Sequence, residues 1–386
     1  MKKRNVCVVV TARPSYSRIR SALQAIQSHP ALELQLVVAA SALLDRYGGT
    51  SHVIEQEGFS INRRVYMIVE GESPVTSAKS TGLGLAEMAT VFDDLKPDVV
   101  VTIADRFETM ATAVCAAYMN IPLVHIQGGE ITGSIDEKVR HAITKLADLH
   151  FVATEQASER VIRMGERTDR VFVTGCPSID VAKEAVANPP QTSQTFFDRY
   201  GGTGSEFDIS NGYIVVLQHP VTTEYREARR HIEETLHAVH ASGLSTLWFW
   251  PNVDAGSDGT SQGIRVFREH QELPNVHFFR NLPPDVFIQT IYRSQCLVGN
   301  SSAGIRECSY LGVPAVNIGS RQAGRDRGAN VIDVGYERHD ILTAIQKQAA
   351  LGRVAEDPLY GTGDAGRRIA ELLADVPLTF EKKLTY

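Results

Sequence analysis

The sequence has few cysteines, and none of them are spaced as a disulfide or zinc motif would require. The 386 residues include five, namely Cys7, Cys115, Cys176, Cys296 and Cys308. The number is odd and no CxxC pair occurs, which argues against a disulfide framework and against a structural zinc site. We therefore expect free thiols, as in a protein of the reducing cytoplasm, and no bound metal.

Long apolar runs are also absent. No stretch approaches the ~18 apolar residues of a membrane-spanning helix. The N-terminal residues MKKRNVCVVVTA look briefly like a signal peptide, but Arg13 interrupts the apolar stretch and no small-residue cleavage site follows it. We expect a first buried strand there instead.

An excess of positive charge is lacking as well. The chain has 39 Lys and Arg against 45 Asp and Glu, a net charge of −6. A chain of that sign has no overall attraction for nucleic acid or for an anionic membrane, so any phosphate must be bound by a local cluster. Walker A and GxSxG motifs are missing, and GLGLAE at 82–87 lacks the third glycine of a dinucleotide fingerprint.

What the sequence does contain is an alternation of apolar β-branched runs with helical patterns. Strands are predicted over 6–10, 32–39, 98–103, 122–126, 150–153, 171–174, 213–218, 244–250, 276–279, 296–298 and 315–318. Helices are predicted over 17–28, 81–95, 107–119, 134–148, 227–241, 284–293 and 305–311. This alternation is typical of parallel sheets that are covered by helices on both faces.

A stretch rich in proline and glycine divides the alternation into two halves. It covers residues 188–204, and such a composition is typical of a linker. At ~150 residues per domain, the length also favours two domains. We predict an N-terminal Rossmann-like domain over 1–187 and a C-terminal one over 205–375, facing a cleft.

Polar residues follow two of the predicted strands in the first half. Ligands of parallel sheets bind where strands end and loops lead into helices. TARPSYS places Arg13 and Ser17 after the first strand, where Arg13 could bind phosphate and Ser17 could cap a helix. IADRFE places Asp105 and Arg106 at the end of the most apolar strand. The alternative is a helix-capping Asp105 with a solvated Arg106.

A glycine-rich loop follows the strand at 122–126. The segment HIQGGEITGSIDEKVRHAITK, residues 125–145, carries Glu130 and Asp136. Paired carboxylates suit general acid–base chemistry on a sugar. A capping box formed by Ser134 and Glu137 would explain those two residues but leaves Glu130 and Asp136 free for function.

Three motifs of the second half also follow strands. LQHPVTTE places His219 after one strand, and FWPNVDAGS places Asn252 after another. VGNSSAGIRECSYLGVPAVNIGSRQAGR combines Ser301 and Ser302 at a predicted helix start with Glu307 and Arg321. Backbone N–H groups at a helix start bind anions, Arg321 can balance phosphate charge, and Glu307 can accept hydrogen bonds from a ribose.

Taken in order along nearly the whole chain, these motifs resemble the hydrolysing UDP-N-acetylglucosamine 2-epimerases, including the epimerase half of the bifunctional animal enzyme. GCPSID at 175–180 belongs to the same set. The resemblance implies a GT-B type fold, UDP held mainly by the second domain, synthesis of N-acetylmannosamine for sialic-type acids, no cofactor, and a dimer or a dimer of dimers.

The resemblance also implies roles for individual residues. The nucleotide and phosphate contacts would be Arg13, Ser17, Arg106, His219, Asn252, Asn281, Ser301, Ser302, Glu307 and Arg321. The resemblance implies Asp105 and Asp136 as the catalytic carboxylates, and the motifs themselves add Glu130 and His219 as candidate catalytic groups.

Two departures from the family pattern keep other functions open. Gln127 stands where many members have a carboxylate, and Asn281 stands where the animal enzyme has a histidine. Gln127 could mark a hydrolysing UDP-N,N′-diacetylbacillosamine 2-epimerase of legionaminic acid synthesis. A non-hydrolysing 2-epimerase, a GT-B glycosyltransferase and a nucleotide-sugar sensor without turnover are the remaining alternatives.

Overall fold

The short apolar runs of the sequence form two parallel-dominated sheets in the computed structural model. It describes residues 3–45, 48–71, 73–132, 135–187, 193–251, 256–383 and 385, with the backbone alone for 193–195. Two units are present: residues 1–130, 135–181 and 360–386 form the first, and residues 131–134 and 182–359 form the second. Each unit contains one seven-stranded sheet.

The first sheet is entirely parallel, with the strand order β3-β2-β1-β4-β5-β6-β7. Its strands are β1 (Arg4–Val10), β2 (Leu32–Ala39), β3 (Ile61–Val65), β4 (Val99–Ile103), β5 (Leu123–Ile126), β6 (Leu149–Val152) and β7 (Val171–Val173). Its helices are α1 (Arg13–Ser17), α2 (Arg20–Ser28), α3 (Thr50–Gln56), α4 (Pro74–Leu95), α5 (Thr109–Tyr118), α6 (Asp136–Leu146), α7 (Glu155–Arg163), the start of α8 (Pro177–Ala187) and α15 (Ala365–Asp375).

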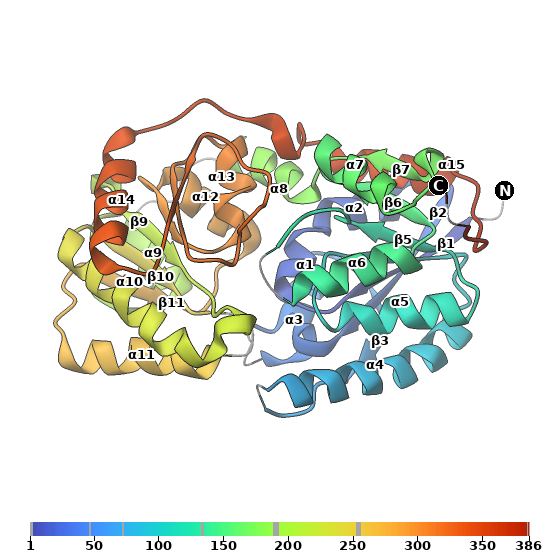
Figure 1. Cartoon of the computed structure of the whole chain (residues 1–386), viewed down its shortest axis with the longest axis horizontal. Coiled ribbons are helices and arrows are strands. Elements are labelled where there is room, and N and C mark those ends of the chain that lie inside the picture. Colours follow the sequence, from blue (N-terminus) through green and yellow to red (C-terminus); the bar gives the residue numbers. More distant parts are fainter. Residues whose placement is uncertain are drawn as a thin grey trace. The chain divides into compact units, whose positions relative to one another are not determined.

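Alternation along β1 divides the hydrophobic core of the first unit between two faces. Val6, Val8 and Val10 pack with α2 and α15, whereas Cys7 and Val9 pack with α4, α5 and α6. Successive strand residues point to opposite faces, so a strand that is apolar throughout must be covered on both. Figure 1 shows α4, α5 and α6 side by side on one of these faces.

The second sheet has the order β14-β13-β12-β9-β10-β11-β8 and is parallel except for β8. Its strands are β8 (Thr203–Gly204), β9 (Ile214–Leu217), β10 (Thr246–Phe249), β11 (Val276–Phe279), β12 (Leu297–Gly299), β13 (Ala315–Ile318) and β14 (Val331–Val334). Its helices are α9 (Ser193–Tyr200), α10 (Ala228–Ser242), α11 (Ser257–His270), α12 (Pro284–Arg293), α13 (Glu307–Tyr310) and α14 (Arg338–Leu351).

The stretch predicted as a linker is partly structured. Residues 188–192 lie outside the described part, but α9 and β8 follow within the predicted linker, and β8 pairs antiparallel with β11. Phe196 and Phe197 of α9 are buried and pack against Phe279. Gly201 and Gly202, both with a positive φ, therefore form the turn between α9 and β8.

The end of the chain also departs from the predicted domain limits. Residues 360–386 belong to the first unit, although the prediction ran the second domain to residue 375. Asp180 of α8 accepts hydrogen bonds from the backbone N–H groups of Ala365 and Gly366, at 3.0 and 2.7 Å, and from the Ser21 hydroxyl of α2 at 2.8 Å. This carboxylate therefore caps α15 and holds it against α2.

Two further observations concern the cysteines and the helices. All five cysteines are buried and free, as predicted. Within the described residues, no helix combines the length and the apolar character that crossing a bilayer requires.

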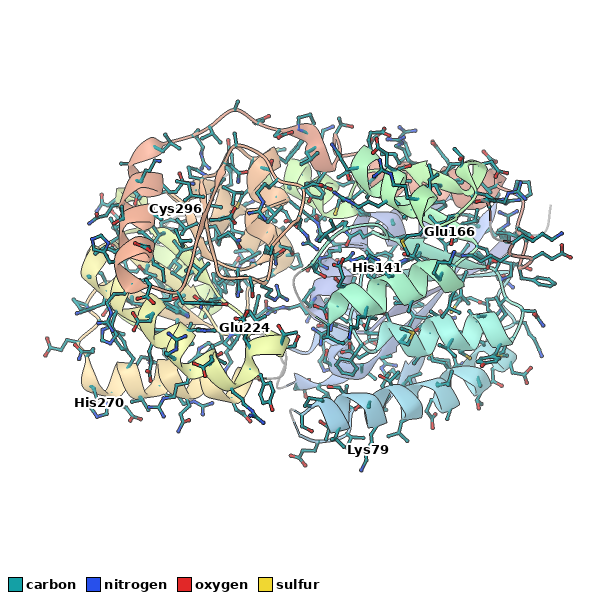
Figure 2. The ribbon with its side chains drawn as sticks, viewed as in Figure 1. Lys79, His141, Glu166, Glu224, His270 and Cys296 are labelled. Atoms are coloured by element: carbon teal, nitrogen blue, oxygen red, sulfur yellow. The ribbon has the colours of Figure 1, made fainter. Side chains whose placement is uncertain are left out.

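A buried carboxylate fastens the C-terminal segment to the first unit. Glu166, labelled in Figure 2, accepts hydrogen bonds from Lys145 of α6 (2.6 Å) and His150 of β6 (3.0 Å) and pairs with Lys382 at 2.7 Å. Lys382 also donates to the carbonyls of Thr144 and Ala147 at the end of α6. Burial alone would raise the pKa of Glu166, but the bonds from His150, Lys145 and Lys382 lower it to about 2.

This arrangement predicts a specific acid sensitivity. Because the folded-state pKa of Glu166 lies below its ordinary value of 4.5, its contribution to stability is complete above pH 4.5 and is lost as the pH falls toward about 2. Glu166→Gln should lose less free energy of unfolding than the wild type across that window in urea titrations. Glu159→Gln on the exposed face of α7 is the control. Equal losses in wild type and Glu166→Gln would contradict the assignment.

Candidate functional site

The carboxyl ends of β1, β4 and β5 place the predicted residues of the first unit. Parallel strands end at the same edge, so the loops after them share one side of the sheet. Arg13 begins α1 directly after β1, Asp105 and Arg106 follow β4, and Glu130 follows β5. Burial lowers the pKa of the Arg13 guanidinium to about 10, so it remains a cation at neutral pH.

Asp105 and Glu130 meet at one arginine that the sequence reasoning missed. Arg140 of α6 is fully buried and donates through Nη2 to Asp105 Oδ2. Its Nη1 donates to the carbonyl of Gln127 at 2.5 Å and lies 4.0 Å from Glu130 Oε2. Asp105 is 6% exposed and Glu130 is 1% exposed. The guanidinium thus compensates two carboxylates that would otherwise repel each other in a medium of low polarity.

The sequence relates Arg140 to the predicted site only through its spacing from Asp136. Arg140 lies four residues after Asp136, one turn along the same helix, so both belong to one face of α6. Asp136 itself is the first residue of α6 and is half-buried. Ser134, the proposed partner of Glu137 in a capping box, lies outside the described residues, and Glu137 accepts a hydrogen bond from His141, labelled in Figure 2.

Gln127 accepts from Arg140 through its backbone carbonyl, whereas its side chain bonds to another loop. Its backbone has a φ of +65°, and its Nε2 donates to Cys176 Sγ at 2.9 Å in the loop between β7 and α8. Cys176 Sγ in turn lies 3.0 Å from Ser178 Oγ. A carboxamide cannot exchange a proton at neutral pH, so Gln127 holds two loops together while the carboxylates keep the acid–base capacity.

The structure corrects two expectations about the neighbouring residues. Asp105 does not cap α5: the N-cap residue is Glu108, and no side chain caps that helix start. The Arg106 guanidinium is not solvated but bonds to the fully buried Glu108 carboxylate at 3.1–3.3 Å. Ser17 is the last residue of α1, and its hydroxyl donates to the Arg13 carbonyl at 3.3 Å. It therefore does not cap the following helix.

Asn300, to which the sequence pattern gave no role of its own, organises the loops of the second unit. It follows β12, and its side chain accepts from the His219 N–H (2.7 Å) and donates to the His219 carbonyl (2.8 Å) after the neighbouring β9. Its own carbonyl accepts from Arg321 Nη1 at 3.2 Å and from Gln322 Nε2 at 2.9 Å. His219 and Arg321 are therefore fixed relative to each other through one asparagine.

Ser301, Ser302 and Glu307 lie together just after Asn300. Ser301 caps a 3-10 turn at Ser302–Gly304, and α13 has only four residues, where the sequence predicted a helix over 305–311. The dipole of so short a helix is small, so anion binding depends on individual N–H groups. Glu307 is 8% exposed, and its Oε2 has no hydrogen-bond partner among the described residues. A buried carboxylate oxygen of this kind fits a hydroxyl donor of a ligand.

A glycine is required where β12 enters this loop. Gly299 has a φ of +130°, and a Cβ there would lie 2.2 Å from the Leu217 carbonyl of β9. No other residue allows the two strand ends to approach so closely. Of the other predicted contacts, Asn281 is half-buried in the loop after β11, and Asn252 lies outside the described residues.

Comparison with known proteins identifies the family and the fold that the chain shares. The family model described as UDP-N-acetylglucosamine 2-epimerase matches residues 24–374. The hydrolysing UDP-N,N′-diacetylbacillosamine 2-epimerase of Legionella pneumophila is 33% identical, with 97% of both chains covered. The UDP-N-acetylglucosamine 2-epimerase of Neisseria meningitidis is 31% identical, with 97% of this chain and 94% of that protein covered.

Solved structures give the fold. The Neisseria meningitidis UDP-GlcNAc 2-epimerase bound to UDP-GlcNAc superposes with a TM-score of 0.80 at 18% identity, covering 96% of this chain and 99% of that one. The Methanocaldococcus jannaschii UDP-GlcNAc 2-epimerase with UDP-GlcNAc and UDP gives 0.78 at 17% identity, with the same coverage. The chain therefore has the predicted GT-B type fold, with two Rossmann-like units.

Proposed function

Because the chain belongs to the UDP-N-acetylglucosamine 2-epimerase family, we propose that it is a hydrolysing member, which converts UDP-N-acetylglucosamine and water into N-acetylmannosamine and UDP. The observation that carries the proposal is the pair of buried carboxylates, Asp105 and Glu130, around the buried Arg140. Carboxylates that follow the carboxyl ends of strands are suited to proton transfer on a bound ligand. The word "hydrolyzing" in the names of relatives from Legionella pneumophila and Campylobacter jejuni gives further support.

The chemistry explains why several acid–base groups are needed. The hydrogen on C2 of the sugar is not acidic, since no carbonyl group activates it. Loss of UDP from C1 builds positive charge on the ring, and removal of the C2 proton then gives a 2-acetamidoglycal. Water adds at C1, and a proton is delivered to the opposite face of C2. The products are the free 2-epimer and UDP. In our proposal Asp105, Glu130 and Asp136 supply the base and acid functions.

The residues of the second unit suit the leaving group. Arg321 and the backbone N–H groups around Ser301 and Ser302 would offset the charge that develops on the departing diphosphate. The Glu307 carboxylate, with its unpaired oxygen, would accept hydrogen bonds from the ribose hydroxyls. None of these roles requires a metal or a redox cofactor.

UDP-N,N′-diacetylbacillosamine is the second candidate substrate. Two relatives, 33% and 30% identical, carry that sugar in their names, in the second case as a GDP- or UDP-sugar. This substrate keeps the 2-acetamido group and the C1 diphosphate, so the same elimination and hydration would apply. Gln127 is the position that we associate with a change of sugar.

Proton NMR in deuterated water tests the proposal. With UDP-N-acetylglucosamine, we expect free N-acetylmannosamine that carries deuterium at C2, together with stoichiometric UDP. A UDP-linked 2-epimer would indicate a non-hydrolysing enzyme, and binding without UDP release would indicate a sensor. If only UDP-N,N′-diacetylbacillosamine yields a free 2-epimer, the second candidate is correct. Turnover that appears only with an added sugar or lipid acceptor would contradict both candidates.

A further inference from the structure

A buried histidine is bonded to the residue that precedes Asp105 and lies outside the proposed acid–base set. His125 of β5 is fully buried. Its Nε2 lies 2.8 Å from the Ala104 carbonyl, and its Nδ1 lies 3.1 Å from the Thr144 hydroxyl of α6. A carbonyl can only accept, so Nε2 carries the hydrogen, and a neutral ring then accepts the Thr144 hydroxyl at Nδ1. The two partners thus select one tautomer.

The surroundings of His125 keep this ring uncharged. Burial lowers the pKa of His125 to about 3; the Ala104 hydrogen bond and the Asp105 charge oppose this shift, and the Arg140 charge adds to it. His150, its register neighbour on β6, also acts to lower that pKa. A group that stays neutral from pH 5 to 8 cannot serve as the acid or base of the reaction in that range.

The residue that His125 binds determines where Asp105 points. Ala104 has a φ of +66°, a left-handed conformation that residues other than glycine adopt rarely. Strand β5 holds this residue from both sides: its N–H donates to the Ile126 carbonyl at 3.0 Å, and its carbonyl accepts from His125. Asp105 is the next residue, so the direction of its carboxylate depends on this turn.

The second contact of His125 closes a ring. Thr144 lies one turn after Arg140 on α6, and Arg140 donates to Asp105. Hydrogen bonds connect Asp105 to Arg140, Thr144 to His125 and His125 to Ala104. Short lengths of chain connect Arg140 to Thr144 along α6 and Ala104 to Asp105, so the ring is closed. The loop after β5 packs on the same pair, since a Cβ on Gly128 would lie 2.9 Å from Thr144 Oγ1 and 3.0 Å from His125 Nδ1.

We propose that His125 is a positioning residue that, as a neutral Nε2–H imidazole, fixes the Ala104 turn and thereby the direction of the Asp105 carboxylate against Arg140. The proposal rests on the function proposed above, in which Asp105 takes part in proton transfer. His125 itself exchanges no proton with the substrate and bears no charge at any stage.

Two amide substitutions separate the contacts of the ring. The amide of glutamine reaches the place of Nε2 and can still donate to the Ala104 carbonyl. The amide of asparagine reaches only the place of Nδ1 and leaves that carbonyl without its donor. We expect His125→Asn to lower kcat about 100-fold, as a misplaced catalytic group does, with KM and the Kd for UDP changed less than about threefold. His125→Gln should recover kcat to within about tenfold of wild type. Equal losses in both variants, or a loss confined to KM, would overturn the proposal.

Two further measurements do not rest on the kinetics of the two His125 variants. Thr144→Val keeps the shape of α6 but removes the hydroxyl donor to Nδ1, and it should lower kcat with KM unchanged. Long-range ¹H–¹⁵N spectra of the wild type, with His125 assigned through His125→Gln, should show a neutral Nε2–H ring from pH 5 to 8. An imidazolium or an Nδ1–H tautomer would overturn the proposal even if the enzyme proves to act on another sugar. Absence of turnover in the wild type, with the expected tautomer present, would count against the proposed function alone.

Discussion

Asp105→Asn is expected to abolish UDP release, with kcat reduced by about 10³-fold or more. Asparagine has the shape of aspartate and can still accept a hydrogen bond from Arg140, but it carries no charge and cannot exchange a proton. The loss therefore measures the acid–base role of the carboxylate and not the space it fills. The measurement is the rate of UDP formation from UDP-N-acetylglucosamine, or from the diacetylbacillosamine analogue if that sugar is the substrate.

A matched control separates this loss from a general effect of the charge. Asp93→Asn on α4 makes the same chemical change at a side chain that is 71% exposed, and it should leave the rate unchanged. Binding of UDP to Asp105→Asn should also match the wild type, because Asp105 is not among the residues that we assign to nucleotide or phosphate contacts. Wild-type turnover in Asp105→Asn would remove Asp105 from the mechanism.

Local sequence patterns predicted much of the fold. They failed for elements whose position is determined by packing against segments that are distant in the sequence. The five residues Val99–Ile103 of β4 are all buried, so the apolar run alone identified a central strand. Helix α9 is different: its Phe196 and Phe197 pack on Phe279, more than eighty residues along the chain. No local pattern indicates such a partner, and the nearby glycines favoured a linker. The capping of α15 by Asp180 is likewise a long-range event.

For the site, the rule that ligands bind at strand ends was enough to select Asp105 and Glu130. It was not enough to find the groups that hold them. Arg140 reads in the sequence as one more charged residue on an amphipathic helix, and charged residues on such helices are usually solvated. Only the three-dimensional structure shows that its side chain is fully buried. The same is true of Asn300, whose side-chain oxygen and nitrogen both bond to the backbone of His219.

Arg140→Met should be the most damaging substitution in the first unit. It removes the buried guanidinium that donates to Asp105 and lies 4.0 Å from Glu130 Oε2, and it leaves the Gln127 carbonyl without its Arg140 donor. Breaking a buried pair by removal of one partner costs about 3–5 kcal/mol, since the remaining charge stays buried. We expect a loss of that size in the free energy of unfolding, measured by urea titration at pH 7, and no detectable turnover. Arg163→Met on α7 is the matched control, because that side chain is 81% exposed and its loss should cost less than about 0.5 kcal/mol.

Arg140→Lys distinguishes charge from geometry. Lysine keeps the positive charge but has no planar fork, so it cannot donate to Asp105 and to the Gln127 carbonyl along two fixed directions. If neutralising the carboxylates were sufficient, Arg140→Lys would retain both stability and activity. The ring through Thr144 and His125 requires the geometry of the guanidinium as well as its charge, because the direction of the Asp105 carboxylate depends on where the guanidinium donates. We therefore expect Arg140→Lys to regain part of the stability that Arg140→Met loses, while kcat stays about 100-fold below the wild type. Wild-type kcat in Arg140→Lys would mean that the charge alone supports the reaction, and the positioning argument for Asp105 would then fail.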